Sequence, residues 1–116
     1  MGASTLQMSE VRSGQTCILA LAGRIDSTNA DQLTARVGKL FEAGEKNLVV
    51  DFREVLYLTS AAFRVLLVAT DDAERSAARF ALCGVLGHVR ELFEMGGLLD
   101  AFTIHASRED AIAQPR

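Results

Sequence analysis

Cysteine is scarce in this sequence: there are only two, Cys17 and Cys83, and they form no Cys-x-x-Cys spacing. Each lies in an apolar run typical of a buried strand, so we predict two reduced, buried thiols. Clusters of Cys and His are missing, and so is a His-x-x-x-His spacing, which excludes the common zinc motifs. We therefore expect neither a metal site nor another cofactor.

Positive charge is not concentrated anywhere along the chain. There are 12 Lys and Arg residues against 15 Asp and Glu, which gives a net charge of −3. The long-range attraction that a binder of nucleic acid or of anionic membranes needs is therefore absent. No stretch approaches the roughly 20 apolar residues that span a bilayer, and no charged and then apolar leader opens the chain. We expect a soluble, cytoplasmic protein without membrane insertion.

Enzyme motifs are missing as well. No Gly-rich phosphate loop is present. Ser60 lacks the Gly-x-Ser-x-Gly elbow of hydrolases, and the sequence shows no base that would activate it. The two histidines, His88 and His105, are predicted to lie on the surface. We therefore predict a protein that is not an enzyme.

The composition is that of one folded domain. Hydrophobic residues make up 49% of the 116 residues and charged residues 23%, a balance that argues against disorder. A chain of this length supports a single hydrophobic core.

The stretch from Asn47 to Arg75 organises the chain. Its apolar run at 48–52 is rich in β-branched and aromatic residues, which favours a strand buried on both faces. After a short connection, the hydroxyls of Thr59 and Ser60 precede a second apolar run, and a hydroxyl there is a helix N-cap signal. Ser60 is thus predicted at the positive end of a helix, near the sheet edge where open α/β folds place their sites. The helical face predicted to point inward consists of Phe63, Leu66, Leu67 and Thr70.

The segments before this stretch predict a hairpin followed by a helix. Alternation over 6–9 indicates a half-exposed strand, and a turn at 13–15 leads into a buried strand at 17–22 that pairs with it antiparallel. Residues 28–31 have the hydroxyl-x-x-acid form of a capping box, which predicts the start of a helix. Gly44 is expected to end that helix in a left-handed conformation. The predicted inner face consists of Leu33, Val37, Leu40 and Phe41.

The segments after it alternate between strand and helix. Strands are predicted at 79–84 and 102–104, with a helix at 88–95 between them. A second capping box at 107–110 opens a last helix that ends before Pro115. Strands that alternate with helices imply right-handed crossovers and a mostly parallel sheet, with the opening hairpin as an antiparallel edge. We predict one α/β domain with about four helices in the order ββαβαβαβα.

Two motifs resemble those of STAS domains, the family of the anti-sigma factor antagonists and their relatives. The segment 49–67 is similar to the family pattern of an apolar strand ending in Asp-Leu, a short turn, and Asp-Ser-Ser/Ala-Gly-Leu before an apolar helix. Residues 23–26, Gly-Arg-Ile-Asp, resemble the family's Gly-x-Leu/Ile-Asp turn before its first helix. Thr59 stands where the family usually has Asp, and Ala62 where it usually has Gly.

This resemblance covers about residues 6–112 of a single domain spanning 1–116, and it implies a protein-binding switch. In the family, the unphosphorylated antagonist binds an anti-sigma factor, which is itself a serine kinase, and so frees a sigma factor. Phosphorylation of the serine that Ser60 matches releases the antagonist, and a phosphatase resets it. The resemblance implies that partner-binding residues lie in or directly beside the two motifs: Arg24, Asp26, Ser27, Thr59, Ser60, Ala61, Ala62 and Arg64.

Two other interpretations stay open. STAS-like domains also serve as cytoplasmic subunits of lipid-transporting ABC systems, where the helix carrying the motif docks on the ATPase. Alternatively, Asp51 is the phosphoacceptor of a two-component receiver domain. A receiver needs an acidic pair after its first strand and a lysine after its last, but here that pair is missing and His105 stands at the lysine's place. Asp51 is better explained as an acceptor of hydrogen bonds from the connecting turn.

Overall fold

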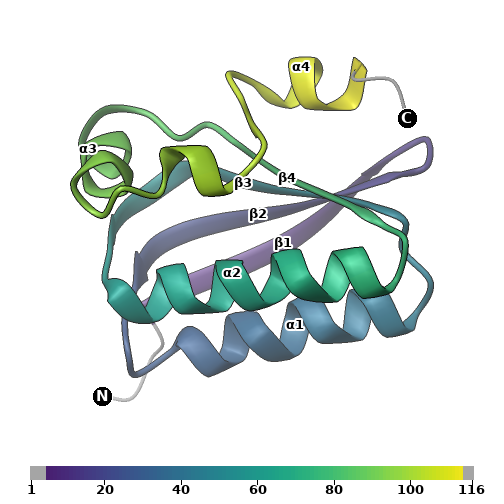
Figure 1. The fold of residues 1–116 in the computed structure, drawn as a ribbon, viewed down its shortest axis with the longest axis horizontal. Coiled ribbons are helices and arrows are strands. Elements are labelled where there is room, and N and C mark those ends of the chain that lie inside the picture. Colours follow the sequence, from purple (N-terminus) through teal and green to yellow (C-terminus); the bar gives the residue numbers. More distant parts are fainter. Residues whose placement is uncertain (1–4, 114–116) are drawn as a thin grey trace.

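The structure is a computed structural model that describes residues 5–113, a range in which the chain forms five strands, four α-helices and one short 3-10 helix (Figure 1). In chain order these elements are β1 (Leu6–Ser13), β2 (Thr16–Ile25), α1 (Ala30–Glu42), β3 (Asn47–Leu58), α2 (Ser60–Arg75), β4 (Arg79–Cys83), α3 (Gly87–Met95), η1 (Leu99–Ala101), β5 (Ile104–His105) and α4 (Arg108–Ala113). The predicted order ββαβαβαβα is confirmed, and the 3-10 helix η1 is the one addition to it.

A single sheet runs through the molecule in the order β1-β2-β3-β4-β5. β1 pairs with β2 antiparallel, whereas all the other neighbouring strands pair in parallel. Helices α1 and α2 lie side by side along one face of the sheet (Figure 1). α4 lies on the opposite face, where its Ala111 packs against buried side chains of β2, β3 and β4. The predicted mixed sheet with an antiparallel hairpin at its edge is therefore confirmed.

The middle strand, β3, is buried on both faces over its first half, as predicted. Residues 48–52 are each at most 4% exposed, and their side chains alternate between the two sides of the sheet. The predicted short connection after this run is wrong. β3 continues to Leu58 with two register shifts against β2, and only Thr59 separates it from α2. Because Val55 and Leu58 are also buried, the second half of the strand is held by packing as well as by pairing.

The buried face of α2 differs from the predicted one. Leu66 is buried as expected, but Phe63 and Thr70 are only half-buried and Leu67 is 41% exposed. The residues that α2 buries are mostly small: Ala62, Val65, Leu66, Ala69 and Ala73. Alanines let the helix approach its neighbours closely, which the spacing of large apolar side chains does not reveal. The helix is therefore rotated relative to the prediction, and part of its apolar stripe faces solvent.

The first helix confirms its predicted inner face but not its predicted start. Leu33, Val37 and Leu40 are buried, and Phe41 is packed against the same core. The capping box at 28–31 is wrong, because α1 begins at Ala30 with Asn29 in the N-cap position and without a side-chain cap bond. The predicted stop is confirmed. Gly44 has a φ of +94°, and the backbone N–H groups of Gly44 and its successor donate to carbonyls of the last helical turn.

The last third of the chain follows the prediction with one displacement. β4 and α3 occupy their predicted places to within one residue. The strand predicted at 102–104 is wrong in position, since β5 comprises Ile104 and His105 while the Phe102 ring packs against Phe93. The second capping box is confirmed on its serine side, because the Asp110 N–H donates to Ser107 Oγ at 3.1 Å. Pro115, the predicted limit of α4, lies outside the described residues.

Both cysteines are buried free thiols, as predicted. Burial is the main cause that raises their pKa, and for Cys83 the neighbouring Asp51 carboxylate adds to burial and raises the pKa to about 12. A thiol with such a pKa is protonated at neutral pH and is a poor nucleophile. Neither cysteine therefore offers reactive chemistry.

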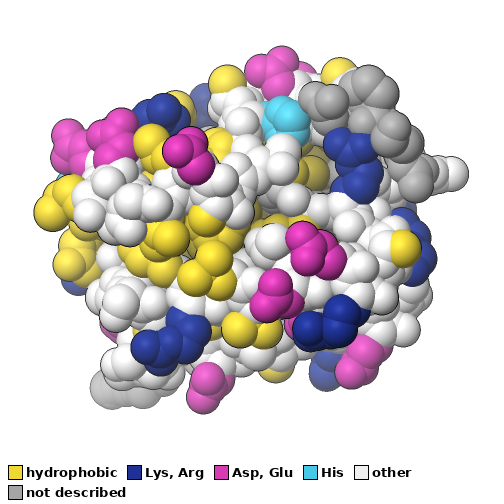
Figure 2. Space-filling model, viewed as in Figure 1, with side chains coloured by type: hydrophobic (Ala, Val, Ile, Leu, Met, Phe, Trp, Pro, Cys, Tyr) yellow, Lys and Arg dark blue, Asp and Glu magenta, His cyan; other side chains and the backbone are white. Residues whose placement is uncertain are grey.

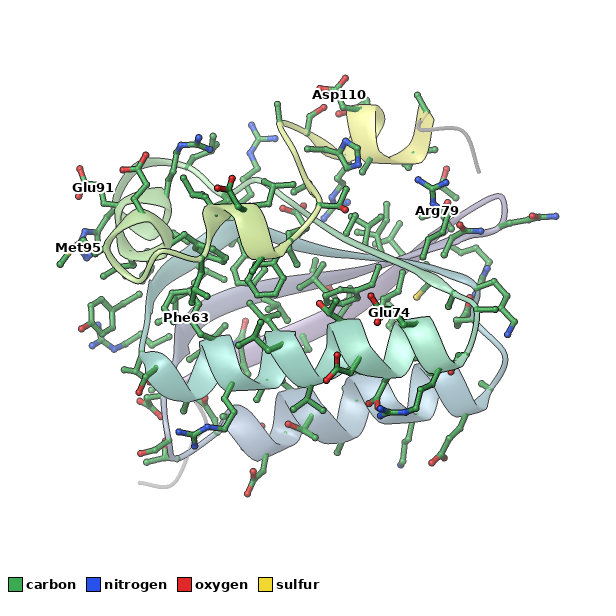
Figure 3. The ribbon with its side chains drawn as sticks, in the orientation of Figure 1. Phe63, Glu74, Arg79, Glu91, Met95 and Asp110 are labelled. Carbon is green, nitrogen blue, oxygen red and sulfur yellow. The ribbon has the colours of Figure 1, made fainter. Side chains whose placement is uncertain are left out.

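We predict that Phe93→Ala lowers the free energy of unfolding by about 3–5 kcal/mol, because the substitution leaves a cavity in the core. Phe93 is fully buried and its ring meets the rings of Phe52, Phe63 and Phe102. Met95, on the same helix but 82% exposed, points away from the core (Figure 3) and provides the control. Urea denaturation should show a change within about 0.5 kcal/mol for Met95→Ala. Similar losses for both variants would contradict this description of the core.

Candidate functional site

Ser60 is the first residue of α2, and its side chain is exposed. The N-cap position belongs to Thr59, whose backbone is extended, with φ −112° and ψ 179°. Neither hydroxyl caps the helix, since α2 has no side-chain cap hydrogen bond. The expected capping role of the hydroxyl pair is therefore wrong, although the predicted place of Ser60 at the helix start is right. Its hydroxyl is free to react without breaking a structural bond.

Thr59 buries its hydroxyl instead of using it. Among the residues that the structure describes, Thr59 Oγ1 is a buried side-chain atom without a hydrogen-bond partner. Its backbone, in contrast, is fully used: Thr59 N–H donates to the Ile25 carbonyl at 3.0 Å, and the Thr59 carbonyl accepts from Ala62 N–H at 2.9 Å. Thr59 thus ties the start of α2 to the end of β2.

Parallel pairing of β2 with β3 brings the two sequence motifs together. Ile25 lies opposite Leu58, and Arg24 lies opposite Tyr57. The turn that follows β2 therefore stands beside the start of α2, at the carboxyl ends of the parallel strands. This is the edge at which open α/β sheets bind their ligands.

Gly23, the glycine of the first motif, is required by a close backbone approach. Its φ is +103°, and a Cβ at this position would lie 2.0 Å from the Thr5 carbonyl oxygen. The neighbouring Arg24 N–H donates to that same carbonyl at 3.0 Å. A side chain at position 23 would push β1 away from the end of β2.

Asn29 organises the turn between β2 and α1, and sequence reasoning missed it. The residue is only 2% exposed. Its Oδ1 accepts from Asp26 N–H at 3.0 Å, while its Nδ2 donates to the Arg24 carbonyl and to Thr5 Oγ1. Buried polar groups need such partners, so Asn29 fixes the path of the turn. Its position just before the helix was a usable signal, but Thr28 next to it offered a more familiar cap.

Asp26 is held as an anion by this turn. The hydroxyl and the N–H of Thr28 both donate to Asp26 Oδ1, at 2.5 and 2.9 Å. These hydrogen bonds, with a smaller contribution from the positive charge of Arg24, lower the pKa of the Asp26 carboxyl below its ordinary value. Asp26 therefore presents a negative charge at neutral pH.

Three side chains from three elements stack beside this turn. The Arg24 guanidinium lies over the Tyr57 ring, 5.0 Å from its centroid. Tyr57 in turn stacks on His88, with centroids 5.8 Å apart and an interplanar angle of 20°. Tyr57 and His88 were not predicted as site residues, because only the fold brings them next to Arg24. The stack fixes the orientation of the Arg24 charge.

The remaining predicted site residues fall into two groups: three line a groove, and one is buried. Ser27, Ala61 and Arg64 line a groove of about 270 Å³ between α1 and α2. Ala62, in contrast, is fully buried, so its methyl group packs inward and does not reach the surface. Its backbone is helical, which explains how alanine is accepted where the family pattern has glycine.

An apolar surface adjoins Ser60 on the other side of α2. Figure 2 shows hydrophobic side chains gathered between α2 and the α3–η1 segment. Phe63 lies one turn after Ser60 and points toward α3 (Figure 3), where its ring meets Phe93 at 4.9 Å. The partly exposed apolar residues of these elements are Phe63, Leu67, Leu92, Leu98, Leu99 and Phe102.

Asp51 lies apart from this site, and the receiver interpretation is wrong. Its carboxylate accepts from Arg53 N–H at 2.9 Å and from Arg108 Nε at 2.6 Å, so it holds α4 against the sheet. Asp51 is therefore an acceptor, as predicted, but its donors belong to β3 and α4 and not to a connecting turn. The strand order also differs from the 2-1-3-4-5 order of receiver domains.

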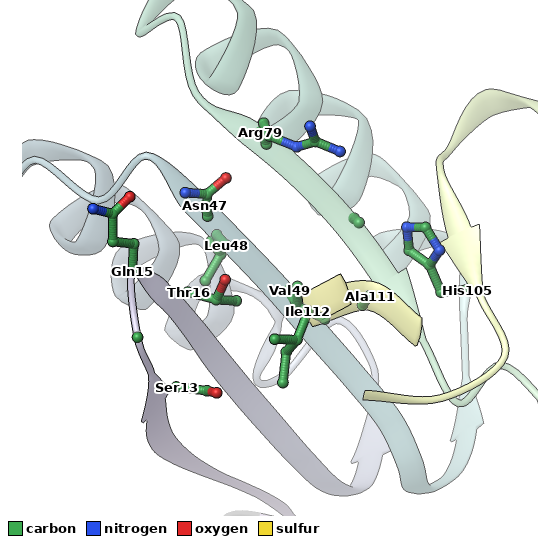
Figure 4. A pocket seen from close by; sticks show the side chains of 12 residues that line it. Ser13, Gln15, Thr16, Asn47, Leu48, Val49, Arg79, His105, Ala111 and Ile112 are labelled. Atoms are coloured by element: carbon green, nitrogen blue, oxygen red, sulfur yellow. The ribbon is translucent and has the colours of Figure 1, made fainter. Parts of the chain in front are cut away.

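A second hollow lies at the opposite end of the sheet (Figure 4). It has a volume of about 350 Å³ and is lined by the β1–β2 turn, by α4 and by the starts of β3 and β4, with Arg79 and His105 at its rim. Over residues 5–113, no three His, Cys, Asp or Glu side chains lie close enough together to hold a metal ion. None of the helices in that range is long and apolar enough to cross a bilayer.

Comparison with known proteins agrees with this geometry. A family model of the STAS domain matches residues 7–111. The anti-sigma factor antagonist BtrV of Bordetella bronchiseptica is 36% identical over 96 residues, which are 83% of each chain. An anti-sigma factor antagonist from Mycobacterium paratuberculosis has the same fold, with a TM-score of 0.83, 19% identity and 92% and 91% of the two chains covered. The phosphorylated form of the Bacillus cell fate determinant SpoIIAA also has this fold. Its TM-score is 0.69, the sequence identity is 21%, and the match covers 92% of this chain and 96% of that one.

We predict that Thr59→Val leaves the free energy of unfolding unchanged or raises it by up to about 1 kcal/mol, because the hydroxyl that it removes is buried and unpaired. A capping role would instead cost about 0.5–2 kcal/mol. Thr28→Val is the matched control, since that hydroxyl donates to Asp26, and its loss should cost about 0.5–1.5 kcal/mol. Urea denaturation of both variants decides the question, and a destabilised Thr59→Val would contradict the unpaired hydroxyl.

Proposed function

This chain belongs to the STAS domain family, among its anti-sigma factor antagonists, and on that basis we propose that Ser60 is the residue that switches its binding to an anti-sigma factor. Proteins of this kind are regulators and not enzymes. In the proposed cycle, the unphosphorylated chain binds the anti-sigma factor. The anti-sigma factor acts as a serine kinase and phosphorylates Ser60, which ends the complex, and a phosphatase then restores the binding form.

The exposure of Ser60 at the start of α2 is the observation that carries this proposal. A kinase must reach the Ser60 hydroxyl, and the negative charge of the added phosphate must be stabilised in the free protein. The N-terminus of a helix provides one, because unpaired backbone N–H groups and the helix dipole stabilise a negative charge by about 0.3–1 kcal/mol. Phosphorylation at this position leaves the fold intact.

The same phosphate is unfavourable once a partner covers it. It adds about −1.5 to −2 charges at pH 7, and in an interface this charge is desolvated and repelled by nearby acidic groups. A loss of about 2.7 kcal/mol in binding free energy corresponds to a hundredfold weaker complex. Charge alone, placed at the centre of a contact surface, is therefore sufficient for a switch.

The surface proposed to contact the partner surrounds Ser60. On one side lie Arg24 and Asp26 with their opposite charges, and then the groove of Ser27, Ala61 and Arg64. On the other side lies the apolar surface around Phe63, whose burial would supply the non-polar part of the contact. Thr59 supports this surface from beneath. Because Thr59 stands where the family pattern has an acidic residue, the partner does not need a positively charged side chain opposite this position.

We predict that the anti-sigma factor kinase transfers one phosphate to this protein in the presence of ATP, and that Ser60→Ala abolishes the transfer. Because Ser60 makes no cap bond, Ser60→Ala should also keep its fold, at a cost below about 0.5 kcal/mol, and should still bind the kinase. Mass spectrometry of the digested protein must locate the phosphate, since Thr59 is the next hydroxyl along the chain.

Titration calorimetry with the same kinase measures the switch itself. Ser60→Asp should bind at least about tenfold more weakly than the wild type, a difference of about 1.4 kcal/mol. Ala35→Asp, which places the same charge at an exposed position of α1, is the control and should bind normally. Phosphate on Thr59, or unchanged binding of Ser60→Asp, would rule out Ser60 as the switch and favour the role as a subunit of an ABC system.

A further inference from the structure

Over residues 5–113, the outer edge of β1 has no neighbouring strand. β1 is the terminal strand of the sheet, pairs with β2 over its full length without a register shift, and is exposed at most of its positions. Proteins usually protect such an edge with proline, lysine, a bulge or a very short strand, because its unpaired backbone groups attract other strands. β1 has eight residues and contains neither proline nor lysine. Its charged residues are Glu10 and Arg12, which carry opposite charges.

The hydrogen bonds between β1 and β2 show which backbone groups of β1 point away from the sheet. Arg24 N–H donates to the Thr5 carbonyl, so the odd-numbered residues of β1 form the hydrogen-bonded pairs with β2. The N–H and C=O groups of Met8, Glu10 and Arg12 therefore point away from the sheet. An added antiparallel strand would form its hydrogen-bonded pairs with these same residues.

The charges on this edge select one register with a second copy of the chain. When Val11 lies opposite the second copy's Val11, Glu10 lies opposite its Arg12, and Arg12 lies opposite its Glu10. A slip to either neighbouring register that keeps the hydrogen bonds places Glu10 opposite Glu10 or Arg12 opposite Arg12. Like charges directly opposite each other destabilise a strand pair, and opposite charges stabilise it. If residues 10 and 12 carried the same charge, like charges would lie opposite each other in each of these three registers.

Ion pairs within each subunit extend this complementarity. Glu10 Oε2 lies 3.3 Å from Arg36 Nη1, and Arg12 pairs with Glu45. Across the two-fold axis, the charges would then alternate in the order Arg36, Glu10, second copy's Arg12, second copy's Glu45. Alternating networks of this kind contribute more than isolated surface pairs.

Val11 provides an apolar contact on the other face of the strand. Its side chain is 42% exposed, although Ile18, which lies opposite it on the same face of the sheet, is buried. In the same register the two Val11 residues form a non-hydrogen-bonded pair, in which side chains approach most closely. Each valine would bury the surface that the other leaves exposed.

We propose that the outer edge of β1 binds the same edge of a second copy of this chain, antiparallel and centred on Val11, so that the two sheets become one. The interface is isologous, as a two-fold axis requires. The axis passes near the start of β2, whereas Ser60 lies at the other end of the sheet. Both Ser60 residues therefore stay accessible, and the dimer does not depend on their phosphorylation.

Sedimentation velocity on the full chain, from about 1 µM to about 1 mM, tests this interface through charge exchange. The wild type should form dimers, and Glu10→Arg and Arg12→Glu should each weaken dimerisation at least about tenfold by placing like charges opposite each other. A mixture of these two single variants should form heterodimers. The double variant Glu10→Arg/Arg12→Glu should dimerise again, but less tightly than the wild type because it loses the ion pairs with Arg36 and Glu45. A wild type that stays monomeric, or variants that dimerise as strongly as it does, would overturn the proposal.

Cross-linking gives an independent test of the register. Across a non-hydrogen-bonded pair the Cα atoms are about 4.5 Å apart, which a disulfide can span. Val11→Cys should therefore form a covalent dimer under mild oxidation, whereas Ser9→Cys, which faces Ser13 of the second copy, should not. The native thiols do not compete because both are buried. Equal cross-linking of both variants, or of neither, would contradict the proposed register.

Discussion

The parallel pairing of β3 with β2 is the interaction on which the rest of the site depends. It continues to the last residue of each strand, where Ile25 faces Leu58, and Thr59 N–H then adds one more bond to the Ile25 carbonyl. The chain enters α2 directly from this bond, so Ser60 has no flexible loop before it. A slip of β3 by one residue would turn its buried side chains to the wrong faces. The core of the sheet therefore fixes where the Ser60 hydroxyl is presented.

The motif at residues 23–26 is fixed by polar contacts instead of apolar ones. Gly23 allows the backbones of β1 and β2 to approach, and buried Asn29 closes the turn that carries Asp26. Each of the two motifs therefore fixes one side of a surface that has Ser60 at its centre. On the proposed switch, a phosphate at Ser60 would act on this surface through its charge, without a change of fold.

The sequence predicts well what depends on local pattern and poorly what depends on tertiary neighbours. The order of the elements, the inner face of α1, the buried first half of β3 and the position of Ser60 at the start of a helix all follow from periodicity and turn chemistry. The rotation of α2 does not, because alanines and not large side chains make its closest contacts. The start of α1 was misplaced because Asn29 bonds to Arg24 and Thr5, partners that only the fold supplies. The stack of Tyr57 on His88 was missed for the same reason.

The central claim is that phosphate at Ser60 acts locally on a scaffold that does not change. Two-dimensional NMR of the 15N-labelled protein, before and after phosphorylation, tests it most directly. Amide shifts should be confined to the start of α2, the end of β3 and the turn after β2, and hydrogen-exchange protection of residues 48–52 should be the same in both forms. Shifts throughout the sheet, or loss of protection in β3, would show that the switch works by rearranging the fold and would contradict the account.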